Sequence, residues 1–435
     1  MSATRSTESL IALTATEARA LMDRGEVTSE QLVRACLERI HDREATVQAW
    51  SHVDADRAVA RARECDARPP VGPLHGIPVG IKDIVDTADM PTERGEPEIY
   101  RGRRPDTDAT LVSHLREAGA VIVGKTAPSK HTIMLPGKTR NPHDPTRTPG
   151  ASSSGSAAAV ADLMVPVTVC SQTAGSILRP ATYCGVVGFK PTKDSVVYDG
   201  TRTYSPHLDT LGSMGRSVPD TTVLMQGMTG DKSFDPSARH EGGLRVGLYR
   251  TPYYDDAEPY VRELFEQSAK TLEAAGIAVR DANMPTEFDA LSELQDVIMS
   301  YDLDKVFADH RRDYPELMDP DLIAYCAKGA KVTPEQYQAA LDHAALCRGM
   351  LEEAMGDLDV LLTPATLTDA PPITTTGTSE FIRIWTFLHT PAISLPSARS
   401  PQGMPIANQL VGRLGDDCRF LAVATRVDEI LGRQY

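Results

Sequence analysis

Two loops rich in glycine and serine lie near the middle of the sequence. They cover residues 150–156 and 171–176, and a short apolar run separates them. A helix and a strand formed by that run can bring the two loops back beside each other. Small residues would let a reacting carbonyl group approach open backbone N–H groups, with several hydroxyls in the same volume. Two solvated turns are the general alternative, but the apolar run argues against a surface linker.

A lysine inside an apolar segment is the second chemically interesting feature. Lys82 lies in the strand-like run 74–86, directly before Asp83. A lysine in such a run more often lies at a strand end and reaches water, because lysine is seldom fully buried. If it is buried instead, desolvation lowers the pKa of the amine and makes the neutral amine available as a base.

Residues 119–126 match the P-loop expression, but we do not interpret them as a nucleotide site. Their interior is a β-branched strand, and Pro128 follows where a phosphate loop needs a helix. Gly119 is better explained as the residue that ends a helix, and Gly124 as part of a turn.

Length and composition indicate a large soluble protein. With 435 residues, 41% of them hydrophobic, the chain can bury a large core. A net charge of −15 argues against nucleic acid or an anionic membrane as the main partner. No run reaches the roughly 18 apolar residues of a membrane span, and no apolar signal segment stands near the N-terminus, so we expect a cytoplasmic location.

The cysteines and histidines are scattered. The seven cysteines form no Cys-x-x-Cys pair, which favours reduced core thiols over disulfides or a zinc site. The eleven histidines include no His-Glu-x-x-His motif. We therefore expect neither a metal nor another cofactor.

The elements that would position these groups follow from the hydrophobic pattern. Residues 1–68 are predicted to be a helical lead-in packed on the core, and 69–435 a single α/β domain, because strand and helix patterns alternate there without a linker. Within it, 193–219 are expected to form a polar rim over the site and 286–357 a helical layer or lid. Strands are expected at 74–86, 120–123, 185–192, 245–249, 277–281, 358–364, 391–396 and 405–412.

Together these segments resemble the amidase signature family of serine hydrolases. The resemblance covers nearly the whole chain and is carried by residues 26–33, 76–83, the two Gly/Ser loops and 391–396. Any one of these motifs alone would be weak, whereas all of them in this order are highly specific. The resemblance implies one large domain in which layers of helices enclose a mixed β-sheet.

The resemblance also implies a mechanism with a serine nucleophile, a second serine in cis peptide geometry and a lysine. By motif position these residues are Ser176, Ser152 and Lys82. An amide carbonyl is a poor electrophile, so Ser176 must lose its proton as it attacks, and a neutral lysine can accept that proton through Ser152. Acylation would release the amine, and water would then hydrolyse the acyl-enzyme.

The loop before the nucleophile is expected to hold the oxyanion of the tetrahedral intermediate. The donors would be the backbone N–H groups of Thr173, Ala174, Gly175 and Ser176. Many relatives carry Asp and two glycines in this loop, where this chain has Gln172 and Ala174. The loop should tolerate alanine, but its local charge differs.

Substrate contacts are expected from Arg179, Gln172 and Ser153. Arg179 follows Ser176 by three residues, whereas many relatives have the arginine two residues after the nucleophile. Malonamidases look similar here and hold the carboxylate of a small carboxylated amide with an arginine, which suits bidentate pairing. A structural ion pair is the alternative for Arg179, as is a hydrogen-bonding role within the loop for Ser153.

The resemblance implies a cofactor-free amidase that cleaves the C–N bond of a small-molecule amide, as a monomer or homodimer. Carbamate (urethane) and aryl acylamide cleavage use the same acyl transfer and remain open. So does the glutaminase subunit of a tRNA-dependent amidotransferase, although the acidic chain has no basic stripe for tRNA. A non-catalytic binding protein on the same fold is the alternative from another class.

Overall fold

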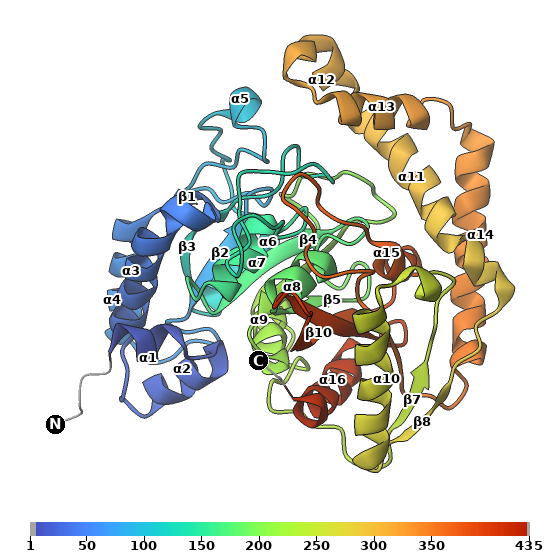
Figure 1. Cartoon of the computed structure of the whole chain (residues 1–435). Coiled ribbons are helices and arrows are strands. Elements are labelled where there is room, and N and C mark those ends of the chain that lie inside the picture. Colours follow the sequence, from blue (N-terminus) through green and yellow to red (C-terminus); the bar gives the residue numbers. More distant parts are fainter. Residues whose placement is uncertain (1–5, 433–435) are drawn as a thin grey trace.

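An 11-stranded mixed β-sheet runs through the computed structural model, which describes residues 6–432 (Figure 1). The strands lie in the order β1-β3-β2-β4-β6-β5-β10-β11-β9-β7-β8. Their bounds are β1 (Trp50–Val53), β2 (Pro78–Lys82), β3 (Val121–Thr126), β4 (Val167–Gln172), β5 (Val187–Lys190), β6 (Thr210–Gly215), β7 (Arg245–Leu248), β8 (Ala278–Asp281), β9 (Val360–Pro364), β10 (Ala392–Arg399) and β11 (Pro405–Val411).

Helices cover both faces of this sheet, as predicted. The longer ones are α2 (Ala15–Asp23), α3 (Ser29–Val47), α4 (Ala55–Asp66), α6 (Thr110–Glu117), α7 (Ser154–Ala161), α8 (Leu178–Cys184), α9 (Val218–Thr229), α10 (Pro259–Ala274), α11 (Leu291–Val306), α13 (Pro320–Gly329), α14 (Pro334–Met355), α15 (Glu380–Phe387) and α16 (Asp417–Leu431). Short helices are α1 (Thr7–Ile11), α5 (Pro97–Tyr100) and α12 (Ala308–Asp313). None of the helices between residues 6 and 432 combines the length and apolar character that crossing a membrane requires.

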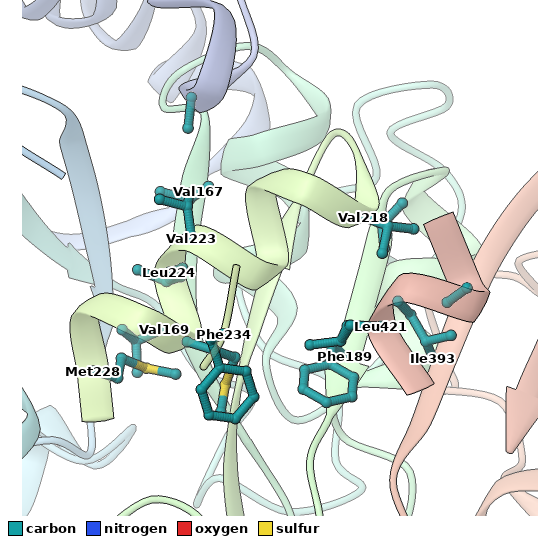
Figure 2. Packing of buried hydrophobic residues seen from close by; sticks show 14 of the residues in the cluster. Val167, Val169, Phe189, Val218, Val223, Leu224, Met228, Phe234, Ile393 and Leu421 are labelled. Carbon is teal, nitrogen blue, oxygen red and sulfur yellow. The ribbon is translucent and has the colours of Figure 1, made fainter. Parts of the chain in front are cut away.

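Alternating residues of the central strands pack into different layers. In β9, Val360 and Leu362 belong to a core cluster with α9, α10 and α16, whereas Leu361 belongs to a second cluster with α8, α11 and α14. Successive strand residues point to opposite faces, so both faces must be apolar where helices cover both. Figure 2 shows part of the first cluster, with Val167 and Val169 beside side chains of α9.

The lead-in contains a strand that was not predicted from the sequence. Within residues 1–68, β1 pairs antiparallel with β3 and forms one edge of the sheet.

The pairing continues to Gly124, where an added Cβ would lie 2.2 Å from the carbonyl oxygen of His52. The prediction that Gly124 belongs to a turn was therefore wrong: this glycine lets two strands approach closely. Gly119, by contrast, follows α6 with a φ of +87°, as a helix-ending glycine does.

The prediction of a rim over 193–219 was wrong in part. Residues 210–215 form β6, which pairs antiparallel with β4 and β5 in the middle of the sheet. This strand was not predicted because it contains two glycines and a serine in six residues, and glycine has a low strand propensity. At Gly212, an added Cβ would lie 2.3 Å from the carbonyl oxygen of Phe189. The glycine is thus required by close packing, not by a turn.

Candidate active site

Lys82 ends β2 between the parallel strands β3 and β4, and its side chain is 1% exposed. The alternative of a strand-end lysine that reaches water is therefore excluded. The amine lies among three hydroxyl groups: Nζ is 2.8 Å from Ser152 Oγ, 2.8 Å from Ser171 Oγ and 3.0 Å from Ser153 Oγ. The two Gly/Ser loops meet at this amine, as the spacing of their sequences predicts.

Burial sets the protonation of this amine. Desolvation by burial lowers the pKa of Lys82 from 10.5 to about 7, and the charge of Asp209 offsets this effect only in part. At neutral pH a substantial fraction of the amine is therefore uncharged and carries a lone pair.

The hydrogen-bonding pattern indicates where that lone pair points. The Ser153 hydroxyl donates to the carbonyl oxygen of Ser171 (3.1 Å), so it can only accept from Lys82. A neutral amine has two N–H bonds. When Ser153 and the Ser171 hydroxyl accept these, the lone pair is left for Ser152. This arrangement suits proton transfer from Ser152 to Lys82.

The backbone of Ser152 is fixed on both sides. The Ala151–Ser152 peptide bond is cis. The carbonyl oxygen of Ala151 accepts a hydrogen bond from Arg179 Nη2 (2.8 Å), and that of Ser152 accepts one from the Ser129 N–H (3.0 Å). The side chain of Ser152 is thereby aimed at Lys82.

Ser176 lies in the loop between β4 and α8 and is partly exposed, unlike Lys82 and Ser152. Its carbonyl oxygen accepts a hydrogen bond from the Ser153 N–H (3.3 Å), which ties the two loops together. Its hydroxyl forms no hydrogen bond to any residue between 6 and 432. The structure thus joins Lys82 to Ser152, while the contact between Ser152 and Ser176 expected in the reacting complex is not formed here. Catalytic hydrogen bonds often tighten only when substrate binds.

The loop 173–176 offers open backbone donors. The carbonyl oxygen of Thr173 accepts from Gln295 Nε2 (3.1 Å), and that of Ala174 accepts from Thr386 Oγ1 (2.7 Å). Because the C=O and N–H of a trans peptide point in opposite directions, the following N–H groups of Ala174 and Gly175 point away from these partners. No described residue accepts a hydrogen bond from them.

Gln172 supports this loop and does not line a cavity. Its Oε1 accepts from the N–H groups of Ile177 (2.9 Å) and Leu178 (3.1 Å) at the start of α8. Its Nε2 donates to Thr386 Oγ1 (2.8 Å), and its side chain is fully buried. The expected substrate contact of Gln172 therefore does not fit its position. The same holds for Ser153, whose hydroxyl is engaged with Lys82 and the Ser171 backbone.

Arg179 connects two segments of the site. Its Nη1 donates to the carbonyl oxygen of Gly377 (2.7 Å) and its Nη2 to that of Ala151. Burial lowers the pKa of Arg179 to about 10, and no carboxylate between residues 6 and 432 forms a salt bridge with it. A structural ion pair is therefore not found, although the residue also lines the cavity beside Ser176.

A small cavity of about 40 Å³ opens beside Ser176. Its walls come from loop 132–134, loop 173–176, Tyr204, α11 and the start of α15. A much larger hollow of about 870 Å³ lies between α10 and β10, but it contains none of the candidate catalytic residues. The small cavity is the candidate active site, because the candidate nucleophile Ser176 and the loop with open backbone donors line it.

Asp209 is a part of the site that was not predicted from the sequence. It accepts a hydrogen bond from Thr173 Oγ1 (2.6 Å) and others from the N–H groups of Tyr204 (2.6 Å) and Ser205 (3.0 Å). Burial raises the pKa of its carboxyl group to about 6. No motif surrounds Asp209, so only the unexpected placement of β6 reveals it. Ser171 was also unassigned, although it begins the second Gly/Ser loop.

Comparison with known proteins gives a consistent result. The family model described as Amidase matches residues 31–421. A glutamyl-tRNA(Gln) amidotransferase subunit of Chloroflexus aurantiacus is 31% identical over 94% of this chain and 95% of its own length. Peptide amidase from Stenotrophomonas maltophilia has a TM-score of 0.82 and 27% identity and covers 98% of both chains. A 6-aminohexanoate cyclic dimer hydrolase has a TM-score of 0.84 and 26% identity, over 97% of this chain and 98% of its own.

The described part of the chain contains no group of three or more His, Cys, Asp or Glu side chains arranged to hold a metal ion. Its seven cysteines are free, and six of them are buried.

Proposed function

Because this chain belongs to the amidase family, we propose that it hydrolyses the amide bond of a small molecule through an acyl-enzyme on Ser176. The observation that carries the proposal is the buried Lys82 amine, whose pKa burial lowers to about 7 and which lies 2.8 Å from Ser152. A base of this kind operates near neutral pH without a histidine.

In the proposed reaction, Ser152 gives its proton to Lys82 and takes the proton of Ser176 as Ser176 attacks the amide carbonyl. The open N–H groups of Ala174 and Gly175 stabilise the oxyanion. The protonated lysine then returns the proton through Ser152 to the leaving amine. Water enters the same position, and the relay activates it to release the acid and regenerate Ser176.

The size of the cavity supports a short acyl group. Its volume of about 40 Å³ leaves no space for a bulky acyl group. A small amide is therefore the substrate class that we favour, and the two arginines in the cavity wall, Arg179 and Arg383, favour one that carries a carboxylate. Carbamates and aryl acylamides use the same relay.

The glutaminase component of a tRNA-dependent amidotransferase is a second candidate, and the relative from Chloroflexus aurantiacus favours it. In that case Ser176 would release ammonia from glutamine, and the chain would act in a complex. Size-exclusion chromatography of protein purified from its own cells distinguishes the two functions. An amidase elutes alone as a monomer or homodimer, whereas an amidotransferase component co-elutes with other chains.

The proposed mechanism is tested by amide turnover in matched variants. We expect Ser176→Ala and Lys82→Met to lose at least about 10³-fold in kcat, because each removes a group that acts in the transition state. The control is Lys190→Met: Lys190 is also fully buried with its pKa lowered to about 7, but its amine binds the carbonyl oxygens of Pro191 and Thr390. Near-wild-type turnover by folded Lys82→Met or Ser176→Ala protein would reject the assignment.

A further inference from the structure

We propose that Arg383, on α15, binds a carboxylate group in the acyl part of the substrate. This inference rests on the proposed amidase function and deepens it. Arg383 is about 200 positions from the nucleophile in the sequence, and no motif marks it. In the structure it lines the same small cavity as Ser176.

The charge on the cavity wall points to an anion. Of the described residues that line the cavity, Arg179 and Arg383 are the only charged ones. Charges interact strongly in a small, largely enclosed volume, because little water is present to screen them. A negatively charged substrate group is therefore attracted, and a positively charged one is repelled.

Arg383 has the spare hydrogen-bonding capacity for this role, and Arg179 has less. Arg179 is 5% exposed, and both of its terminal nitrogens already donate to backbone carbonyl oxygens, so only its buried Nε has no partner among the described residues. Arg383 is 20% exposed, and its Nε and Nη2 are 3.4 Å and 3.3 Å from Ser379 Oγ, which is long for such bonds.

The carboxylate of Asp296 does not saturate Arg383. The Nη1 atom of Arg383 is 3.6 Å from Asp296 Oδ1, beyond hydrogen-bond distance. Asp296 has closer partners of its own, the Tyr325 hydroxyl at 2.6 Å and the Lys328 amine. The planar fork of Arg383 is therefore available, and this geometry matches the two oxygens of a carboxylate.

Packing places this arginine close to the reacting centre. A Cβ added to Gly175 would lie 2.6 Å from Ser379 Cβ, so Ser379 packs directly on the loop that holds the oxyanion. Arg383 follows one helical turn later and contacts Ser379. With so little space between them, the carboxylate should be only one or two carbons from the scissile carbonyl. Monoamides of short dicarboxylic acids meet this requirement.

Tyr204 supplies a further donor in the same cavity. Its hydroxyl is buried and lacks a hydrogen bond of good geometry to any residue between 6 and 432, and Thr132 is the side chain that interacts with it. A buried hydroxyl without a partner is costly, and burial raises the pKa of Tyr204, so the group stays a neutral donor. A carboxylate offers enough lone pairs to accept from both Tyr204 and Arg383.

The test compares malonamate with malonamide, which has the same size but no charge. We expect the wild-type protein to prefer malonamate. In Arg383→Gln, the ratio of kcat/KM for malonamate to that for malonamide should fall about 100-fold, the effect of losing a charge-assisted bidentate pair. Arg383→Lys keeps the charge without the fork and should restore part of the preference. Thermal unfolding verifies that each variant is folded.

The control is Arg262→Gln on α10, which removes an arginine with a similarly long ion pair, 3.7 Å to Asp255, outside the cavity. Its substrate ratio should equal that of the wild type. The inference would be overturned if the wild type had the same kcat/KM for malonamate and malonamide. It would also be overturned if Arg383→Gln lowered kcat/KM for both substrates by the same factor. Hydrolysis of other amides, but of neither malonamate nor malonamide, would also overturn the inference. The proposed amidase function would still stand in that case. Only a wild-type protein that hydrolyses no amide at all contradicts the proposed function itself.

Discussion

The properties of Lys82, the proposed base, come from its surroundings. Three hydroxyl groups contact its amine, and none of them can neutralise a charge. A carboxylate in the same place would stabilise the protonated form and raise the pKa, which would remove the base. Serine side chains satisfy the N–H groups of the amine without this effect. The serines of both loops therefore bind the Lys82 amine without raising its pKa.

This reasoning predicts how the rate depends on pH. Burial lowers the pKa of Lys82 to about 7, so the amine is protonated and inactive as a base below this pH and neutral above it. We expect kcat to rise about tenfold per pH unit on the acid side and to level off above about pH 7. Steady-state kinetics between about pH 5 and 9 measure this profile. A rate that falls as the pH rises through 7 would mean that the protonated amine is the active form.

At the scale of elements, one side chain links β4, α8 and α15. Gln172 ends β4, satisfies two N–H groups that α8 leaves without a partner and holds Thr386 of α15. Thr386 in turn donates to the carbonyl oxygen of Ala174 and so sets the direction of the next N–H. An aspartate could accept from α8, but its carboxylate could not donate to Thr386.

Replacing Gln172 should therefore affect both stability and rate. We expect Gln172→Leu to lower the free energy of unfolding by about 3 kcal/mol, because buried donors lose their acceptor. The variant should also lower kcat by more than about tenfold with a smaller change in KM. Urea denaturation and steady-state kinetics measure the two effects.

Gln338→Leu on the exposed side of α14 provides the control, since this glutamine contacts only Asp342 there. Gln338→Leu should change neither the free energy of unfolding nor kcat appreciably. A folded Gln172→Leu protein with unchanged kcat would show that the orientation of the loop does not depend on this side chain.

A helix or strand could be predicted from the sequence where residues close together in the chain determine it. At the start of α3, Thr28 and Gln31 form a capping box, whose pattern of residues is contained in the local sequence. β1 and β6 were not predicted, because their existence depends on partners far away in the sequence. β6 contains residues with low strand propensity and is held by β4 and β5 on either side.

At the scale of the whole molecule, the helical layer predicted over 286–357 forms one wall of the cavity. α11 contributes Met299 and Leu303 to it. The short helix α12 after it contacts α5 through a partly buried hydrogen bond between His310 Nε2 and the Tyr100 hydroxyl (3.1 Å). That this layer moves as a lid stays a prediction.

The candidate site was only partly predictable for the same reason. Lys82 and Ser152 were identified because each lies in a recognisable motif. Asp209, Thr386 and Arg383 reach the site through the overall arrangement of the sheet and its helices, and nothing in their own sequence neighbourhoods indicates the contact. The sequence does not show which way a loop side chain points, and in the structure Gln172 is hydrogen-bonded to α8 and α15. Its contact with the substrate stays a prediction.

The central claim is that one hydroxyl in this protein, that of Ser176, is activated as a nucleophile. Its most direct test is the mass of the protein after reaction with a fluorophosphonate, which reacts covalently with activated serines. We predict a single adduct per chain, located by peptide sequencing at Ser176, absent in Ser176→Ala and formed much more slowly in Lys82→Met. An adduct on another residue, or undiminished labelling of Ser176→Ala, would contradict the account.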